Sequence, residues 1–133
     1  MNAKQVYERV SLVANIGERQ FFDRLNDTLV SLGAAYGETP KLLWEAGEDG
    51  EYPEGQWVKS LSDELVLLPL YHAALPDNIL YLSGAGETYG QEFLRKSREA
   101  WLAYWNRDAK GRTIKGKEGG NCVRQRCNCQ GVY

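Results

Sequence analysis

The stretch from Leu65 to Arg107 limits the possible fold more than any other part of this sequence. It consists of an apolar segment, a helix introduced by proline, a glycine turn and an aromatic helix. The run over 65–70 is apolar without alternation, and Pro69 is incompatible with a helix interior, so we expect an extended segment there. The stretch carries no pattern typical of bond chemistry, which favours assembly over catalysis.

Two helices are predicted within this stretch. Pro76 suits the first turn of a helix over 76–83, which a Gly-x-Gly turn then closes. Thr88 is a suitable N-cap for a longer helix over 88–107. The apolar face of this longer helix is formed by Tyr89, Phe93, Ala100 and Tyr104 and is widened by Leu94, Trp101 and Trp105.

Two further helices are predicted in the first half of the chain. Asn2 can cap a helix over 3–14, and Gly37 is well placed to end a helix whose apolar stripe runs over 22–36. The apolar positions at helical spacing are Ala3, Val6, Val10 and Val13 in the first helix and Phe22, Leu25, Leu29, Leu32 and Tyr36 in the second. The sequence therefore predicts a mainly α protein, with a small four-helix bundle in a domain over 1–107.

A long acidic loop is predicted over 37–63, because prolines and glycines interrupt any regular element there. Loops of this length are uncommon in compact domains and are often functional or mobile. Trp44 and Trp57 flank its centre, where they either anchor the loop to the body or contact another subunit. A single lysine accompanies the acids of 38–54, which are Glu38, Glu45, Glu48, Asp49, Glu51 and Glu54.

The charge of the chain is divided unevenly between its body and its end. Residues 1–106 contain 9 Lys and Arg against 16 Asp and Glu, a net charge of −7, whereas 107–133 contain 7 against 2, a net charge of +5. The segment 108–133 has no apolar periodicity, so we predict an extended, flexible basic tail without a core of its own. Such a tail binds an acidic surface or nucleic acid, or is merely a solvated terminus.

The length of 133 residues is typical of one domain, and no apolar run approaches the roughly 18 residues of a membrane span. Glu8 and Arg9 stand where a signal peptide would need apolar residues, so we expect a protein made and kept in the cytosol, without membrane contact.

Candidate chemical sites are sparse. The cysteines form a C-x4-C-x-C cluster without a nearby fourth ligand, which disfavours zinc and leaves free thiols as the main interpretation: Cys122, Cys127 and Cys129. His72 lies in an apolar neighbourhood and is expected to be a satisfied core or interface residue rather than a general base. The sequence thus predicts neither a catalytic site nor a cofactor nor a metal.

Three segments resemble the head–tail connector (adaptor, or head-completion) proteins of tailed bacteriophages and prophages. They are the early helix FFDRLNDTLVSLGAAYG, the segment LVLLPLYHAALPDNILYLSGAGE and the closing helix YGQEFLRKSREAWLAYW. The resemblance covers roughly residues 4–107, and its motifs are patterns of hydrophobicity and punctuation.

The resemblance implies a structural role at the head–tail junction of a virion that is assembled in the cytoplasm of a bacterial host. Proteins of this family form a homo-oligomeric ring, usually of about twelve subunits, beneath the portal protein. The ring extends the channel for packaged double-stranded DNA, which it approaches without specific binding, and offers a surface to the next connector or tail protein. A phage tail-assembly chaperone or another small adaptor protein is the alternative, followed by a metal-dependent or redox protein that uses the cysteines.

Two sets of candidate residues follow from these considerations. Since C-terminal segments of the family often reach onto the portal, the partner-binding set is Arg112, Ile114, Lys115, Lys117, Arg124, Arg126 and Tyr133. The candidates for the subunit interface or the channel are Trp44, Glu45, Glu48, Asp49, Glu51 and Trp57.

Overall fold

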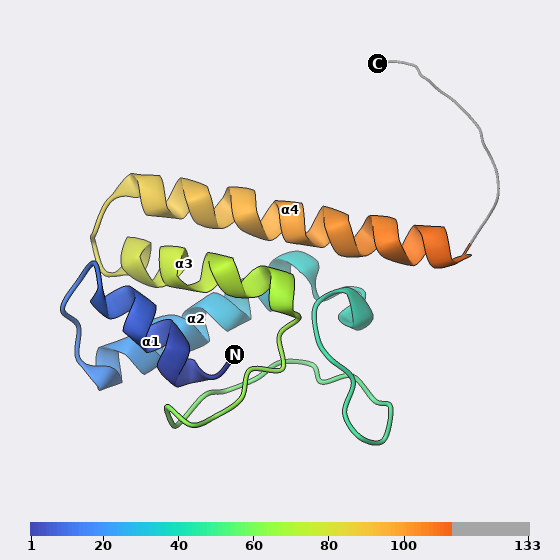
Figure 1. Ribbon diagram of the computed structural model, residues 1–133, viewed down its shortest axis with the longest axis horizontal. Helices are drawn as coiled ribbons and strands as arrows, with labels where there is room; N and C mark the ends of the chain where they lie inside the picture. The colour runs from blue at the N-terminus through green and yellow to red at the C-terminus, as the bar shows by residue number, and fades with distance from the viewer. Residues whose placement is uncertain (113–133) are drawn as a thin grey trace, which may run out of the picture. The chain divides into compact units, whose positions relative to one another are not determined.

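The computed structural model describes residues 1–112 and contains four α-helices in that range (Figure 1). They are α1 (Ala3–Ser11), α2 (Glu18–Tyr36), α3 (Leu75–Leu82) and α4 (Glu87–Arg112), with the 3-10 helices η1 (Pro40–Leu42) and η2 (Pro69–Ala74) between α2 and α3. In the described part of the chain, β pairing is limited to the isolated bridges Asn2–Glu64 and Trp44–Leu67. The predicted mainly α class is therefore confirmed.

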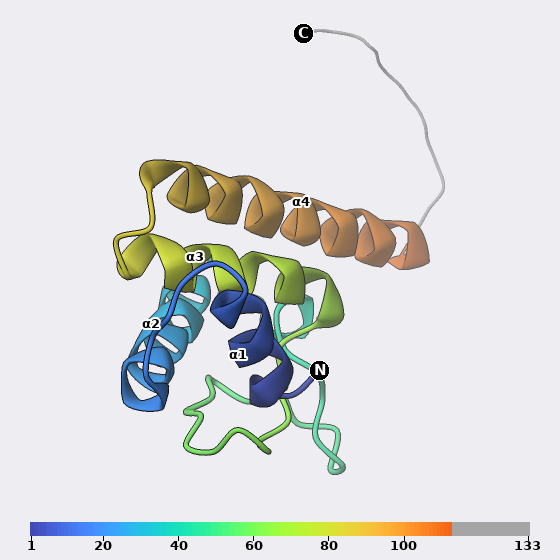
Figure 2. The same ribbon diagram turned by 60° about the vertical axis from the view of Figure 1, so that its left-hand side comes forward.

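The chain divides into two compact units, Met1–Leu102 and Ala103–Tyr133. In the first unit, α3 contacts α1, α2 and η2, and it lies between the α1–α2 pair and the part of α4 up to Leu102 (Figures 1 and 2). Leu75 and Ile79 of α3 are completely buried. The short apolar helix predicted after the proline is thus the centre of this unit.

The N-terminal helix begins as predicted and ends earlier. Asn2 caps α1 through a capping box, since its Oδ1 accepts from the backbone N–H of Gln5 at 3.1 Å and its own N–H donates to Gln5 Oε1 at 2.9 Å. The prediction that the helix extends to residue 14 is wrong, because the backbone turns after Ser11 to begin α2 at Glu18. Val13 is consequently 55 % exposed, and Ile16 is the apolar residue that this connection buries.

Helix α2 ends at Gly37 as predicted, but it begins four residues before Phe22. Its fully buried aromatic residue is Phe21, whose ring packs against Tyr7 and Phe22 with centroid distances of 4.8 and 5.5 Å. The added turn brings Phe21 over α1, where burial of its ring decides which of two adjacent phenylalanines faces the core.

The segment before α3 is extended only in part. Extended backbone continues to Leu68, and Pro69 then begins η2, so the predicted extended segment over 65–70 is two residues too long. Proline has no N–H to lose at a helix start, which makes Pro69 a starting residue rather than an obstacle. The prediction of a helix over 76–83 is confirmed to within one residue, and Gly84 and Gly86 adopt the positive φ angles of 85° and 146° that its closing turn needs.

Helix α4 is longer than predicted, because it continues past residue 107 to Arg112. Ala109, Lys110 and Arg112 in this region are good helix formers, and the region contains no proline. Its buried positions up to Leu102 are Phe93, Ser97 and Ala100. The expectation that Leu94 widens the buried face is wrong, since this side chain is 65 % exposed.

Candidate functional site

The connection between α2 and α3 is attached to α2 by the side chain of Asn26. The Asn26 Nδ2 donates to the carbonyl oxygen of Val58 at 3.0 Å, and the N–H of Val58 donates to Asn26 Oδ1 at 2.7 Å. Asn26 is 2 % exposed and Val58 is 1 % exposed, so both hydrogen bonds are shielded from water. The amide therefore fixes the backbone at residue 58 in the same way as a neighbouring strand would.

A second amide fixes the residue before Trp57. Gln56 Nε2 donates to the carbonyl oxygen of Glu64 at 2.7 Å, and the N–H of Val66 donates to Gln56 Oε1 at 3.0 Å. Since Val58 is held by α2, the residues on both sides of Trp57 are anchored.

The same connection also completes the N-terminus of α1. The N–H groups of Ala3 and Lys4 donate to the carbonyl oxygens of Asp63 and Leu61 at 3.0 and 2.9 Å. These are two of the donors that a helix start leaves without a partner in the helix. The first turn of α1 thus holds the connection in place instead of offering its N–H groups to an anion.

The two tryptophans of this connection have different environments. Trp44 is 1 % exposed and forms a bridge with Leu67, which favours the anchoring interpretation for this residue. Trp57 is 62 % exposed, although its neighbours on both sides are fixed. Only the second tryptophan is available to another molecule.

The acidic residues predicted for an interface or channel all lie on the surface: Glu45, Glu48, Asp49 and Glu51. Glu48, Asp49 and Glu51 lie on a turn that closes by a hydrogen bond from the N–H of Gly47 to the carbonyl oxygen of Glu51, at 2.8 Å. Glu45 precedes this turn, and its N–H donates to the carbonyl oxygen of Val66 at 2.8 Å. Three of the four line a cleft of about 660 Å³, which we call the acidic cleft, and Glu64 is a fourth acid there. The remaining lining residues include apolar ones, namely Met1, Pro53, Leu65 and Val66.

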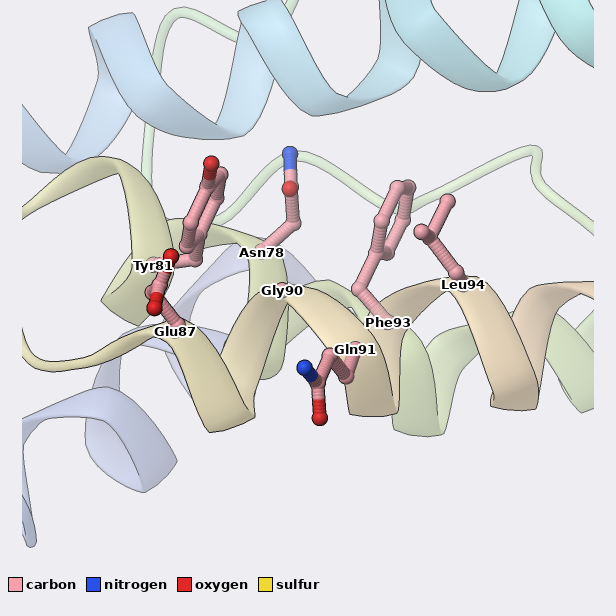
Figure 3. Close-up of a pocket in the computed structure, with 7 residues that line it drawn as sticks. All are labelled: Asn78, Tyr81, Glu87, Gly90, Gln91, Phe93 and Leu94. Carbon is pink, nitrogen blue, oxygen red and sulfur yellow. The ribbon is translucent and has the colours of Figure 1, made fainter.

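A second, smaller cleft lies between α3 and α4 (Figure 3). This α3–α4 cleft has a volume of about 270 Å³ and is lined by Asn78, Tyr81, Glu87, Gly90, Gln91, Phe93 and Leu94. The side chains of Asn78, Tyr81 and Phe93 point the same way, toward α2. Asn78 Nδ2 donates to Thr28 Oγ1 on α2 at 2.8 Å, which fixes one wall of the cleft.

Gly90 permits the close approach of the two helices at this cleft. A Cβ atom at this position would lie 2.8 Å from Cδ1 of the Tyr81 ring. The sequence contains no direct indication of this cleft. A glycine inside a helix nevertheless indicates a close contact with a neighbouring element, because glycine makes a helix about 1 kcal/mol less stable than alanine does. Asn26, buried in the middle of α2, is a similar signal for a polar contact.

Ion pairs strengthen α4 and its contact with α3. Lys96 Nζ lies 2.7 Å from Asp77 Oδ2, and this pair joins the two helices. On the exposed side of α4, Arg95 contacts Glu92 at 2.8 Å and Glu99 at 2.9 Å. The hydrogen bond from Arg95 lowers the pKa of Glu92, and the two carboxylates raise the pKa of Arg95. This exposed network supports the helix.

His72 is a core residue, as expected. It is 8 % exposed, and its Nε2 lies 2.7 Å from the carbonyl oxygen of Leu67. Because a carbonyl oxygen only accepts, Nε2 carries the proton. Burial lowers the pKa of His72, and the hydrogen bond to Leu67 acts in the opposite direction. The ring therefore serves structure within η2.

Most of the predicted partner-binding set lies outside the described residues, and so do the three cysteines. Arg112 is the final residue of α4. Between residues 1 and 112, no group of three or more His, Cys, Asp or Glu side chains is placed to hold a metal ion. No helix of that same range is long and apolar enough to cross a membrane.

Comparison with protein-family models finds no matching family, and comparisons with curated proteins and with solved structures find no significant match.

Proposed function

We propose that the protein is a structural subunit of a phage head–tail connector ring, which docks under the portal, extends the DNA channel and joins the capsid to the tail. In this proposal the four helices act as a small bundle, and the acidic connection between α2 and α3 is presented to neighbouring molecules. The observation that carries the proposal is the exposed side chain of Trp57 on an anchored backbone.

The environment of Trp57 supports an assembly role on energetic grounds. Burying a large apolar side chain stabilises a folded protein by about 1.5–3 kcal/mol. The fold gains this stabilisation at the buried Trp44 but not at the exposed Trp57. Tryptophan is enriched at the centres of protein interfaces, and a residue whose backbone is held before binding loses less entropy when it binds. An anchored, exposed tryptophan is therefore typical of a surface that another protein covers.

The acidic cleft supports a position next to packaged DNA. Glu45, Asp49 and Glu51 line it and carry negative charge on an exposed turn. A surface of this sign repels phosphates and allows DNA to slide past without adhesion. The same surface can instead meet a basic segment of a neighbouring ring.

The C-terminal charge supports a contact with the portal. Residues 107–133 carry a net charge of +5, whereas 1–106 carry −7. A basic segment can bind an acidic partner surface and place the ring upon it.

The proposal is tested by quantitative mass spectrometry of purified, DNA-filled particles from the source phage or induced prophage. We expect about a dozen copies of this chain per particle, at a fixed ratio to the portal protein. A chain that is abundant in infected cells and missing from particles would contradict the connector role. The tail-assembly chaperone would then be the better interpretation, because a chaperone acts before the particle is complete.

A further inference from the structure

We infer that the Trp57 side chain of one copy inserts into the α3–α4 cleft of a second copy, and that this contact joins successive subunits. The inference rests on the proposed function, because it assigns the subunit contact of the proposed ring to particular residues. The side chain that fills the cleft therefore comes from a second copy of this chain.

The backbone that carries Trp57 is anchored on both sides. On one side of it, Gln56 bonds the backbone of Glu64 and Val66 through both ends of its amide. On the other, Val58 is held by Asn26 of α2. Trp57 itself is 62 % exposed, so its backbone position is held before binding while its ring remains accessible.

The α3–α4 cleft suits one large apolar side chain. Its volume of about 270 Å³ lies below the roughly 300–1,000 Å³ of typical small-molecule pockets. Phe93 and the ring of Tyr81 stand on its two sides, and Leu94, which is 65 % exposed, lies at its edge (Figure 3). An indole placed among these side chains would remove exposed apolar surface on both copies.

One pair of opposite charges lies beside the two surfaces. Lys59 is exposed two residues after Trp57. Glu87 is exposed and lines the α3–α4 cleft. With Trp57 in the cleft, the ammonium group of Lys59 is brought toward the carboxylate of Glu87, which favours this orientation of the partner.

Trp57 and the α3–α4 cleft lie on different sides of α2, so the Trp57 side chain of one copy cannot enter the cleft of that same copy. Asn26 holds the residue that follows Trp57, whereas Thr28 bonds Asn78 in the wall of the cleft. Residues two positions apart on a helix point about 200° apart around its axis. In both views the green loops of the α2–α3 connection lie on the side of α3 away from α4 (Figures 1 and 2). In the proposed ring each copy uses its Trp57 toward one neighbour and its cleft toward the other, which makes the contact head-to-tail, the type that closes into rings.

The test uses sedimentation velocity of the full chain, from about 10 µM to about 1 mM. We expect wild-type protein to self-associate, and we expect Trp57→Ala and Leu94→Glu to weaken association at least about 30-fold, as for a hot-spot residue. Both residues are largely exposed, so both variants should fold, which circular dichroism verifies. Leu12→Ala is the control, because Leu12 is 87 % exposed and belongs to neither surface.

Comparing wild type with a mixture of the two variants tests head-to-tail contact, because head-to-tail wild-type protein should form species larger than dimers. The Trp57→Ala copy retains its cleft, and the Leu94→Glu copy retains its tryptophan, so the mixture should form dimers and nothing larger. Charge reversal provides a second measurement: Lys59→Glu and Glu87→Lys should each weaken association, and the double variant should restore it. Wild-type protein that stays monomeric at about 1 mM, or a mixture that stays monomeric, would overturn the inference.

The outcomes separate this contact from the connector proposal. If Trp57→Ala enters particles at the wild-type copy number, the contact is wrong and the connector role stands. If wild-type protein associates through these residues in solution but is missing from particles, the contact stands and the connector role is wrong.

Discussion

The side-chain amide of Asn26 makes both hydrogen bonds that the backbone of Val58 offers on that side, at 3.0 and 2.7 Å, across 32 positions of sequence. This single side chain joins the middle of α2 to the connection that carries Trp57. Neither group has access to water, so the pairing has no solvent substitute.

Replacement of Asn26 by alanine should therefore destabilise the protein by about 2–4 kcal/mol, because two buried backbone groups lose their partners. Urea denaturation measures the loss, and hydrogen exchange at the Val58 amide should become faster. Asp27→Ala is the matched control on the exposed neighbouring position and should stay within about 0.5 kcal/mol of wild type. Equal stability of the two variants would contradict the assigned role of Asn26.

Gly90→Ala should destabilise the protein even though alanine favours helices. The added methyl group would lie 2.8 Å from the Tyr81 ring, so the ring or the helix must shift from its position in the folded protein. In a Tyr81→Ala background the same substitution should stabilise by up to about 1 kcal/mol, the ordinary helix propensity gain. Thermal unfolding of the four proteins tests this change of sign, and a substitution with the same effect in both backgrounds would argue against a steric contact.

The pair of Asp77 and Lys96 should contribute more than the exposed ion pairs of α4. Asp77 has only 13 % of its side chain exposed, so solvent screens the interaction weakly. A double-mutant cycle with Asp77→Asn and Lys96→Met should give a coupling energy of about 1 kcal/mol that changes little with salt. Arg95→Gln provides the exposed comparison, and its smaller effect should shrink further as salt is added.

Burial of His72 predicts a loss of stability in mild acid. Its pKa is lowered in the folded protein, so below about pH 6.5 the unfolded chain binds a proton that the folded chain does not. The free energy of unfolding should fall as pH decreases from there, until the folded-state pKa is reached. Glu45 opposes this lowering, while Arg9 and the N-terminal amine reinforce it.

Denaturation at about pH 7.5 and about pH 5.5 measures this dependence. His72→Gln retains a donor for the carbonyl oxygen of Leu67 and has no group that titrates in this range. Its stability should vary less with pH than that of wild type. Since the chain has one histidine, an unchanged pH dependence would show that other groups cause it.

Sequence alone determined the existence and type of the four α-helices, because their signals are local, whereas the 3-10 helices η1 and η2 were missed. Apolar residues at helical spacing identified α1 and α2, Asn2 and Gly37 marked two of the ends, and Pro76 marked the start of α3. The early end of α1 and the choice of Phe21 over Phe22 were missed. Both depend on where the next helix lies and not on the neighbouring residues.

Tertiary structure decided which residues of the α2–α3 connection are available for function. Trp44 and Trp57 have equal apolar character, yet pairing with Leu67 buries the first, and the anchors on both sides of the second leave it exposed. The α3–α4 cleft likewise depends on Gly90 meeting Tyr81 across a turn. Helical periodicity depends on residues three and four positions apart, so it can be recognised in the sequence. These hydrogen bonds and close approaches instead join positions far apart in the sequence, which only tertiary packing brings together.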